Sequence, residues 1–207
     1  MSKAEQYSSK AAGWSDAEYA DAHAYLAHRA GLVATLGGAL HPGDEVLDIA
    51  CGDGGLGQHL LSRGLRYRGI DAEPSMVEAA TRRLGPNVPV ELGELDTYAP
   101  PAPVAATTVF RAIYYVRDRT AFFARVASYT GRKLVFDLNP RQYRVDDIVT
   151  ELEAAGFGDV VLRPFFVPQT RALPGPAIAA LKGLERSGPL ARLALRARFT
   201  YLVAASL

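Results

Sequence analysis

The chain has 207 residues, 49% of them apolar, and its 23 basic and 22 acidic residues leave a formal charge of +1. This composition suits one domain with a substantial core, and the near-neutral charge argues against nucleic acid as the partner. Cys51, the single cysteine, excludes an internal disulfide and favours a reducing, cytoplasmic setting. We expect neither a secretory leader nor a membrane span.

Hydrophobic periodicity and chain-breaking residues predict alternating helices and strands. The expected elements, in chain order, are helix 16–40, strand 44–50, helix 55–63, strand 66–71, helix 74–84, strand 88–93, strand 105–110, helix 118–129, strand 132–138, helix 144–155, strand 159–167 and a last strand at 199–206. Alternation of this kind favours an α/β fold, in which helices cover both faces of a mainly parallel sheet.

Residues 45–57 join an apolar strand to a glycine-rich turn and then to a helix. The branched apolar residues of the strand indicate a buried, central position. The carboxylate of Asp48 therefore needs hydrogen-bond donors, either from the following loop or from a ligand. Gly52 and Gly54 permit positive φ and a close approach of that ligand. The pattern predicts a nucleotide-binding loop.

Two classes of ligand use such a turn. The string Gly52-x-Gly54-x-x-Gly57 matches the dinucleotide fingerprint, and Asp71, at the end of the next strand, suits the ribose hydroxyls of either class. Asp48 separates the classes, because an acid at this position would repel a pyrophosphate and would suit a ligand with a cationic end. An NAD(P)-dependent oxidoreductase is the alternative function, and a non-catalytic cofactor-binding partner subunit is a second one.

At these residues the sequence resembles the class I S-adenosylmethionine-dependent methyltransferases of the small-molecule type. Their first motif reads roughly Asp/Glu-x-Gly-x-Gly-x-Gly. Residues 48–54 (DIACGDG) are similar to it, with Ala50 in place of the first glycine, and residues 69–76 (GIDAEPSM) look like the second motif. The resemblance implies a Rossmann-like three-layer sandwich. Its seven-stranded, mostly parallel sheet would have an antiparallel last strand, an N-terminal helical cap and a helical insertion before the last strand.

The resemblance also implies S-adenosylmethionine as cofactor and S-adenosylhomocysteine as product. Asp48 would face the amino-acid end of the cofactor, and Asp71 would hold the ribose. Met76 is alternatively a core methionine, Asp96 a cap or turn residue, and Arg111 a partner for a local acid. The expected cofactor contacts are Asp48, Ala50, Cys51, Gly52, Gly54, Asp71, Ala72, Met76, Leu95, Asp96 and Arg111.

The acceptor contacts are expected from two regions. Tyr114 and Asn139 follow the fourth and fifth strands, on the side where parallel sheets bind ligands, although Asn139 also suits a turn before Pro140. In related small-molecule methyltransferases N-terminal helices cap the pocket, which adds Tyr7, Trp14 and His23. Methyl transfer from a sulfonium is an in-line displacement that positioning and exclusion of water can promote. We therefore assign no catalytic residue and no metal.

Residues 163–198 carry seven Lys or Arg residues and one acid, Glu185. This basic segment has three interpretations: a lid over an apolar or lipid-like small-molecule acceptor, a basic amphipathic surface at 174–198 in peripheral contact with a membrane, or a packed helical pair. The oligomeric state stays open. We expect a single domain, 1–207, divided into a helical cap (1–40), a cofactor-binding core (41–167), a helical insertion (168–197) and the last strand (198–207).

Overall fold

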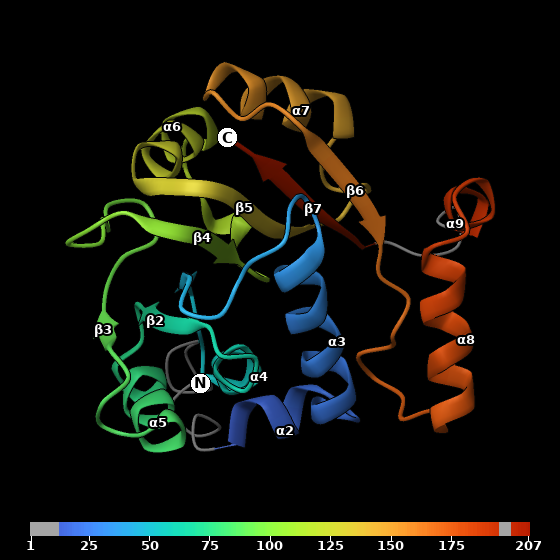
Figure 1. Ribbon diagram of the computed structural model, residues 1–207, viewed down its shortest axis with the longest axis horizontal. Coiled ribbons are helices and arrows are strands. Elements are labelled where there is room, and N and C mark those ends of the chain that lie inside the picture. The colour runs from blue at the N-terminus through green and yellow to red at the C-terminus, as the bar shows by residue number, and fades with distance from the viewer. Residues whose placement is uncertain (1–12, 195–199) are drawn as a thin grey trace.

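The computed structural model describes residues 13–194 and 200–207 (Figure 1). One sheet of seven strands, in the order β3-β2-β1-β4-β5-β7-β6, forms the centre of the molecule. The strands are β1 (Glu45–Ile49), β2 (Arg66–Asp71), β3 (Val90–Leu92), β4 (Val104–Val109), β5 (Thr130–Leu138), β6 (Val160–Pro164) and β7 (Tyr201–Ser206). The helices are α2 (Trp14–Glu18), α3 (Ala22–Thr35), α4 (Gly55–Leu61), α5 (Pro74–Leu84), the short 3-10 helix η2 (Ile113–Tyr115), α6 (Arg119–Tyr129), α7 (Val145–Ala154), α8 (Gly175–Glu185) and α9 (Pro189–Ala194).

The strand pairing confirms the predicted topology. β1 lies parallel between β2 and β4, and the parallel ladder continues to β3 on one side and to β5 on the other. β7 is antiparallel to both of its neighbours, β5 and β6. The fold is therefore α/β and Rossmann-like, with a mostly parallel sheet and an antiparallel last strand. This topology brings the carboxyl ends of β1, β2, β4 and β5 to one edge of the sheet.

Alternate residues along each strand contribute to the two apolar layers. Val46 of β1 packs in the layer that includes Leu26, Ala30 and Val33 of α3. Its neighbour Leu47 points to the opposite layer, with the phenylalanines of α6. Figure 1 shows α3 and α4 on one side of the sheet, and α6 and α7 on the other. Burial on both faces explains why the central strands are apolar throughout.

The expected helix 16–40 is wrong as a single element. Tyr19 is extended (φ −117°, ψ 126°) and ends α2, and Asp21 starts α3 by accepting a hydrogen bond from the N–H of Ala24 at 2.9 Å. This is the usual role of an aspartate before a helix. α3 ends at Thr35, before Gly37 with φ +63°. The first helical region therefore consists of two helices with a turn between them.

Other boundaries differ at the sheet edges. The strand expected at 159–167 ends at Pro164, and that expected at 88–93 contains only Val90–Leu92. The helical insertion before the last strand is confirmed as α8 and α9, although the first residues of the 168–197 range form no helix. No helix in the described ranges is long and apolar enough to cross a membrane.

Candidate functional site

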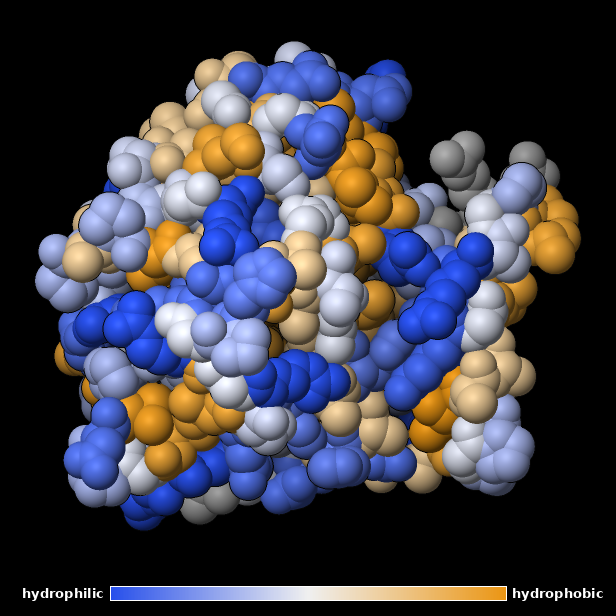
Figure 2. Space-filling view, viewed as in Figure 1, coloured by the Kyte–Doolittle hydropathy of each residue, from blue (hydrophilic) through white to orange (hydrophobic). Residues whose placement is uncertain are grey.

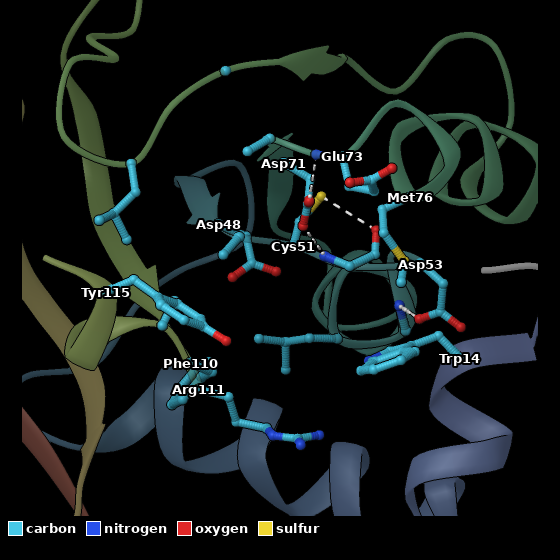
Figure 3. Close-up of a pocket in the computed structure, with 18 of the residues that line it drawn as sticks. Trp14, Asp48, Cys51, Asp53, Asp71, Glu73, Met76, Phe110, Arg111 and Tyr115 are labelled. Atoms are coloured by element: carbon cyan, nitrogen blue, oxygen red, sulfur yellow. Dashed lines mark hydrogen bonds between the residues drawn. The ribbon is translucent and has the colours of Figure 1, made fainter. Parts of the chain in front are cut away.

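A cavity of about 410 Å³ lies at the carboxyl ends of β1, β2 and β4, bordered by α2 and α3 (Figure 3). Most of the predicted contact residues line it, although they come from distant parts of the sequence, because parallel strands end at a common edge. Those that line it are Trp14, Asp48, Ala50, Cys51, Gly52, Asp71, Ala72, Met76, Leu95, Asp96, Arg111 and Tyr114.

Three predicted residues that the structure describes are not among the lining. His23 is exposed and its ring lies 5.0 Å from that of His59, outside the cavity. Asn139 accepts a hydrogen bond from the N–H of Arg141 at 3.0 Å, so it is the turn residue that its position before Pro140 also allowed. A short polar side chain of this kind satisfies its own turn.

The third is Gly54. Tyr7, which was also predicted to contact the acceptor, lies outside the described residues. Gly54 precedes α4 with φ +76°, and a Cβ there would meet Leu84 and Ala80 of α5. Gly54 therefore serves the packing of α4 on α5 and is not among the residues that line the cavity.

Asp48 is buried, with 3% of its surface exposed. Its carboxylate accepts hydrogen bonds from the hydroxyls of Tyr67 at 2.9 Å and Thr108 at 2.7 Å. Burial raises the pKa of Asp48 to about 6, and the two hydrogen bonds oppose that rise. We expected donors from the loop or a ligand, whereas these come from the flanking strands β2 and β4. An ionised carboxylate at neutral pH is thus held at the wall of the cavity.

Two glycines make room for the Tyr67 ring. A Cβ at Gly57 would lie 2.7 Å from Cζ of Tyr67, and a Cβ at Gly69 would lie 3.1 Å from Cε1 of Tyr67. Both distances are too short for atoms in contact. The third glycine of the Gly-x-Gly-x-x-Gly string therefore lets the Tyr67 hydroxyl reach Asp48. Gly57, the residue that completes the match to the dinucleotide fingerprint, is therefore explained by packing against Tyr67.

Asp71 connects the end of β2 to the glycine loop. Its Oδ2 accepts from the N–H of Gly52 at 2.8 Å, and its Oδ1 accepts from the N–H of Glu73 at 3.0 Å. Burial raises the pKa of this carboxyl above its ordinary value, while these backbone hydrogen bonds act in the opposite direction. An ionised carboxylate has about four acceptor positions, so acceptor capacity remains for a hydroxyl group of a ligand.

Two residues of the wall have left-handed backbone conformations. Ala50 follows β1 with φ +58°, and Arg111 follows β4 with φ +56°. Such conformations are strained for residues with a Cβ and concentrate at functional sites. The N–H of Arg111 is held by Oδ1 of Asp137 at 2.7 Å, and its guanidinium pairs with Glu18 at 3.2 Å. Arg111 therefore lines the cavity and also pairs with an acid.

Asp53 fixes α2 against the glycine loop, a role that the sequence reasoning missed. It is 2% exposed and accepts from the N–H and the hydroxyl of Ser15, at 2.9 and 2.5 Å, and from Arg83 at 2.7 Å. Trp14, next in sequence to Ser15, is thereby placed over the cavity (Figure 3). The available signal was an acid directly before a helix start, where orphan N–H groups attract carboxylates.

Arg29 of α3 is the second residue that was missed. It is 2% exposed, lines the cavity and lies over the ring of Phe110, 4.3 Å from its centroid. Nη2 donates to the hydroxyl of Tyr25 at 2.8 Å and lies 3.7 Å from Oδ2 of Asp137. Nε is buried without a hydrogen-bond partner in the described part of the chain. No sequence pattern separates such an arginine from a surface one.

The strand order and the cavity at the switch between β1 and β4 define a Rossmann-like nucleotide-binding protein. Residues 46–132 match the family described as "Methyltransferase domain". A 55-residue segment is 51% identical to an uncharacterised methyltransferase of Schizosaccharomyces pombe. It makes up 27% of this chain and 21% of that protein, so the match spans about a fifth of the relative's length.

Solved structures with the same fold are more distant in sequence. A methyltransferase of Haloferax volcanii, in complex with the Trm112 methyltransferase activator, has a TM-score of 0.66 at 17% identity over 97% of both chains. An S-adenosylmethionine-dependent methyltransferase of Mesorhizobium loti has a TM-score of 0.63 at 18% identity, over 87% of this chain and 98% of that one. Phosphoethanolamine N-methyltransferase 2 of Haemonchus contortus was solved with phosphomonomethylethanolamine and S-adenosylhomocysteine. It has a TM-score of 0.61 at 18% identity, over 86% of this chain and 52% of that one.

The methyltransferase domain at residues 46–132 and the solved neighbours support the predicted class I S-adenosylmethionine-dependent methyltransferase family. They also support the predicted cofactor, because solved neighbours contain bound S-adenosylmethionine or S-adenosylhomocysteine.

Proposed function

We propose that this protein transfers a methyl group from S-adenosylmethionine to a small organic acceptor and releases S-adenosylhomocysteine. One observation carries the proposal: the cavity joins Asp48, the glycine loop at Gly52 and Asp71 at a single edge of the sheet. These residues offer a buried negative charge, an open backbone and a carboxylate with spare acceptor positions. Together they match the cationic end and the ribose of the cofactor.

The charges of the wall support this assignment. Asp48 contributes a negative charge and Arg29 a positive charge to the wall of the same cavity, and both side chains are almost completely buried. The amino-acid end of the cofactor is zwitterionic, so Asp48 would attract its ammonium group and Arg29 its carboxylate. The unpaired Nε of Arg29 is a donor without an acceptor in the described residues. A buried donor of this kind favours an anionic ligand group.

The other end of the cavity suits the nucleoside. Asp71 would accept hydrogen bonds from the ribose hydroxyls. Leu95 and Asp96 form a turn that lines the cavity after β3, and Met76 lines it from α5. Met76 is also 3% exposed and packs on Ala79, so its core role and its place in the cavity coincide. Leu95 and Met76 would enclose the adenine between apolar side chains.

When bound, the cofactor supplies a methyl carbon made electrophilic by its sulfonium. The chain's contribution is to orient an acceptor in line with that carbon and to exclude water. Trp14 and Tyr115 face the cavity from opposite sides in Figure 3, and the wall between them includes Phe110. Tyr114 and Tyr115 are 46% and 50% exposed, so they stand at the opening, where an acceptor enters. We assign no base, since positioning is sufficient for several acceptor types.

Thermal unfolding with added ligands tests this function. S-adenosylhomocysteine should raise Tm, because a ligand present at about 100 times its Kd stabilises the folded state by about 2.7 kcal/mol. NAD and NADP at the same concentrations are the matched controls and should leave Tm unchanged. A rise with NAD or NADP but none with S-adenosylhomocysteine would replace the methyltransferase with the oxidoreductase. Binding without methyl transfer to any member of a small-molecule acceptor panel would favour the non-catalytic partner subunit.

A further inference from the structure

α8 and α9 stand at one side of the molecule, away from β3 at the other (Figure 1). The inner face of α8 is accounted for by packing. Ile178 contacts the layer that contains α3, and Leu181 and Leu184 pack with Phe166 and the buried Ala191 of α9. This confirms that the three apolar residues of α8 share one face, as their helical spacing predicts. The packing explains the inner face but not the outer one.

Glu185, at the end of α8, points inward. Its Oε2 lies 2.6 Å from Nε2 of His28, and its Oε1 accepts from the N–H of Phe166 at 2.7 Å. Glu185 is 3% exposed. It is also the one acid between Arg163 and Arg198 in the sequence. The insertion is therefore tied to α3 by its acid, and this acid contributes almost nothing to the surface of the insertion.

The outward surface is apolar and has no acid. Pro176, Ala179 and Ala180 of α8 are exposed, and α9 exposes two large side chains, Leu190 (62%) and Leu193 (58%). Figure 2 shows orange and tan surface on α8 and α9 at the right edge of the molecule. A single exposed leucine is common on proteins, whereas several exposed apolar side chains on two helices in contact indicate an interaction site.

Basic residues lie on α8 and next to its ends. Arg186, directly after α8, is exposed, Lys182 of α8 is partly exposed, and Arg171, in the segment before α8, is exposed. None of the three forms an ion pair within the described ranges. Apolar side chains combined with cations and no exposed acid give the chemistry that binds an anionic lipid surface.

We propose that the outer surface of α8 and α9, defined by Ala179, Ala180, Arg186, Leu190 and Leu193, docks on the surface of an anionic lipid bilayer. The two leucines enter the headgroup region, and the cations stay at the level of the phosphates. Charge complementarity is the reason for choosing lipid over a second copy of the chain, since two identical basic surfaces repel each other.

Vesicle co-sedimentation tests the proposal. The full chain should bind vesicles in which a third of the phosphatidylcholine is replaced by phosphatidylglycerol, and should bind pure phosphatidylcholine weakly. Raising the salt concentration should weaken binding. The double variant Leu190→Ser and Leu193→Ser should lose at least about tenfold in partition coefficient, because about half of each leucine side chain would leave an apolar environment. Arg186→Gln should lose about fivefold.

Matched substitutions on the far side of the molecule are the controls. Leu92→Ser removes a leucine that is 61% exposed, and Arg117→Gln removes an arginine side chain that is 93% exposed. Both should bind vesicles as the parent does. Equal binding by the leucine double variant and the parent would overturn the proposal. It would also be overturned if the parent ignored the vesicles and sedimented as a dimer that the double variant abolishes. None of these readouts depends on methyl transfer, so failure here leaves the proposed function untouched.

Discussion

The hydroxyl of Thr108 keeps Asp48 ionised, and its removal should move the pH dependence of cofactor binding. Thr108 is fully buried on β4 and donates to Oδ1 of Asp48 at 2.7 Å. Thr108→Val retains the shape and removes this donor. A hydrogen bond to a charged group contributes about 1.5–3 kcal/mol, which corresponds to about one to two pH units. The pKa of Asp48, about 6 in the parent, should therefore rise to between about 7 and 8 in the variant.

The consequence is measurable at neutral pH. At pH 7 the ionised fraction of Asp48 should fall from about nine-tenths to between about a half and a tenth. Because the ionised form attracts the cationic end of the cofactor, the Kd for S-adenosylhomocysteine should rise about two- to tenfold at pH 7. Near pH 9 Asp48 is ionised in both proteins, so the two Kd values should converge. Calorimetric titrations across this pH range give both numbers.

Thr107→Val is the matched control. Thr107 is also fully buried on β4, but its hydroxyl bonds to that of Thr130 at 2.7 Å, on the other face of the sheet. It removes an equivalent hydroxyl without touching Asp48, so it should leave the pH profile of binding unchanged. If Thr108→Val and Thr107→Val gave the same profile as the parent, the reasoning about Asp48 would be refuted.

Three further substitutions test the residues around the loop. Burial raises the pKa of Asp48 in the folded state above its value in the unfolded chain, so the stability that this carboxyl contributes is lost as pH rises through about 6. Asp48→Asn should therefore be at least as stable as the parent at pH 7 in urea unfolding, while the Kd of the variant for S-adenosylhomocysteine should rise. Gly57→Ala should displace Tyr67 and lower the free energy of unfolding by about 1–3 kcal/mol. Its control is Gly183→Ala on α8, where a Cβ meets nothing within 4 Å and the free energy of unfolding should rise. Equal changes in the two variants would show that Gly57 is not needed to make room for the Tyr67 ring. Ala50→Gly should relieve about 1–2 kcal/mol of backbone strain against about 0.5–1 kcal/mol of chain entropy, so a clear loss of unfolding free energy would show that φ +58° is unstrained.

The sheet was predictable because its signals are local. Apolar runs, helical periodicity and breaker residues repeat along the chain, and each one constrains a single element. The break between α2 and α3 was missed because helical residues continue through it, and the decisive feature is the Asp21 cap. A capping side chain outweighs propensity when tertiary contacts hold the helix on either side of it.

The residues of the cavity also fall into those that a local sequence signal predicts and those that depend on tertiary contacts. Asp48, Gly52 and Asp71 were found because motif and strand end coincide in the sequence. Arg29 and Asp53 were missed because their roles arise from packing between α2, α3 and the loop. His23 and Asn139 were expected from their type and position, but the direction of a side chain on a helix or in a turn places them outside the cavity. A sequence gives such directions only where the surrounding contacts are known.

A crystal structure of the protein with S-adenosylhomocysteine bound would locate the cofactor site. We expect the ribose hydroxyls on the carboxylate of Asp71, the adenine beside Leu95 and Asp96, and the amino-acid end between Asp48 and Arg29. Occupation of another site, or a ligand in this cavity with its ribose away from Asp71, would contradict this expectation.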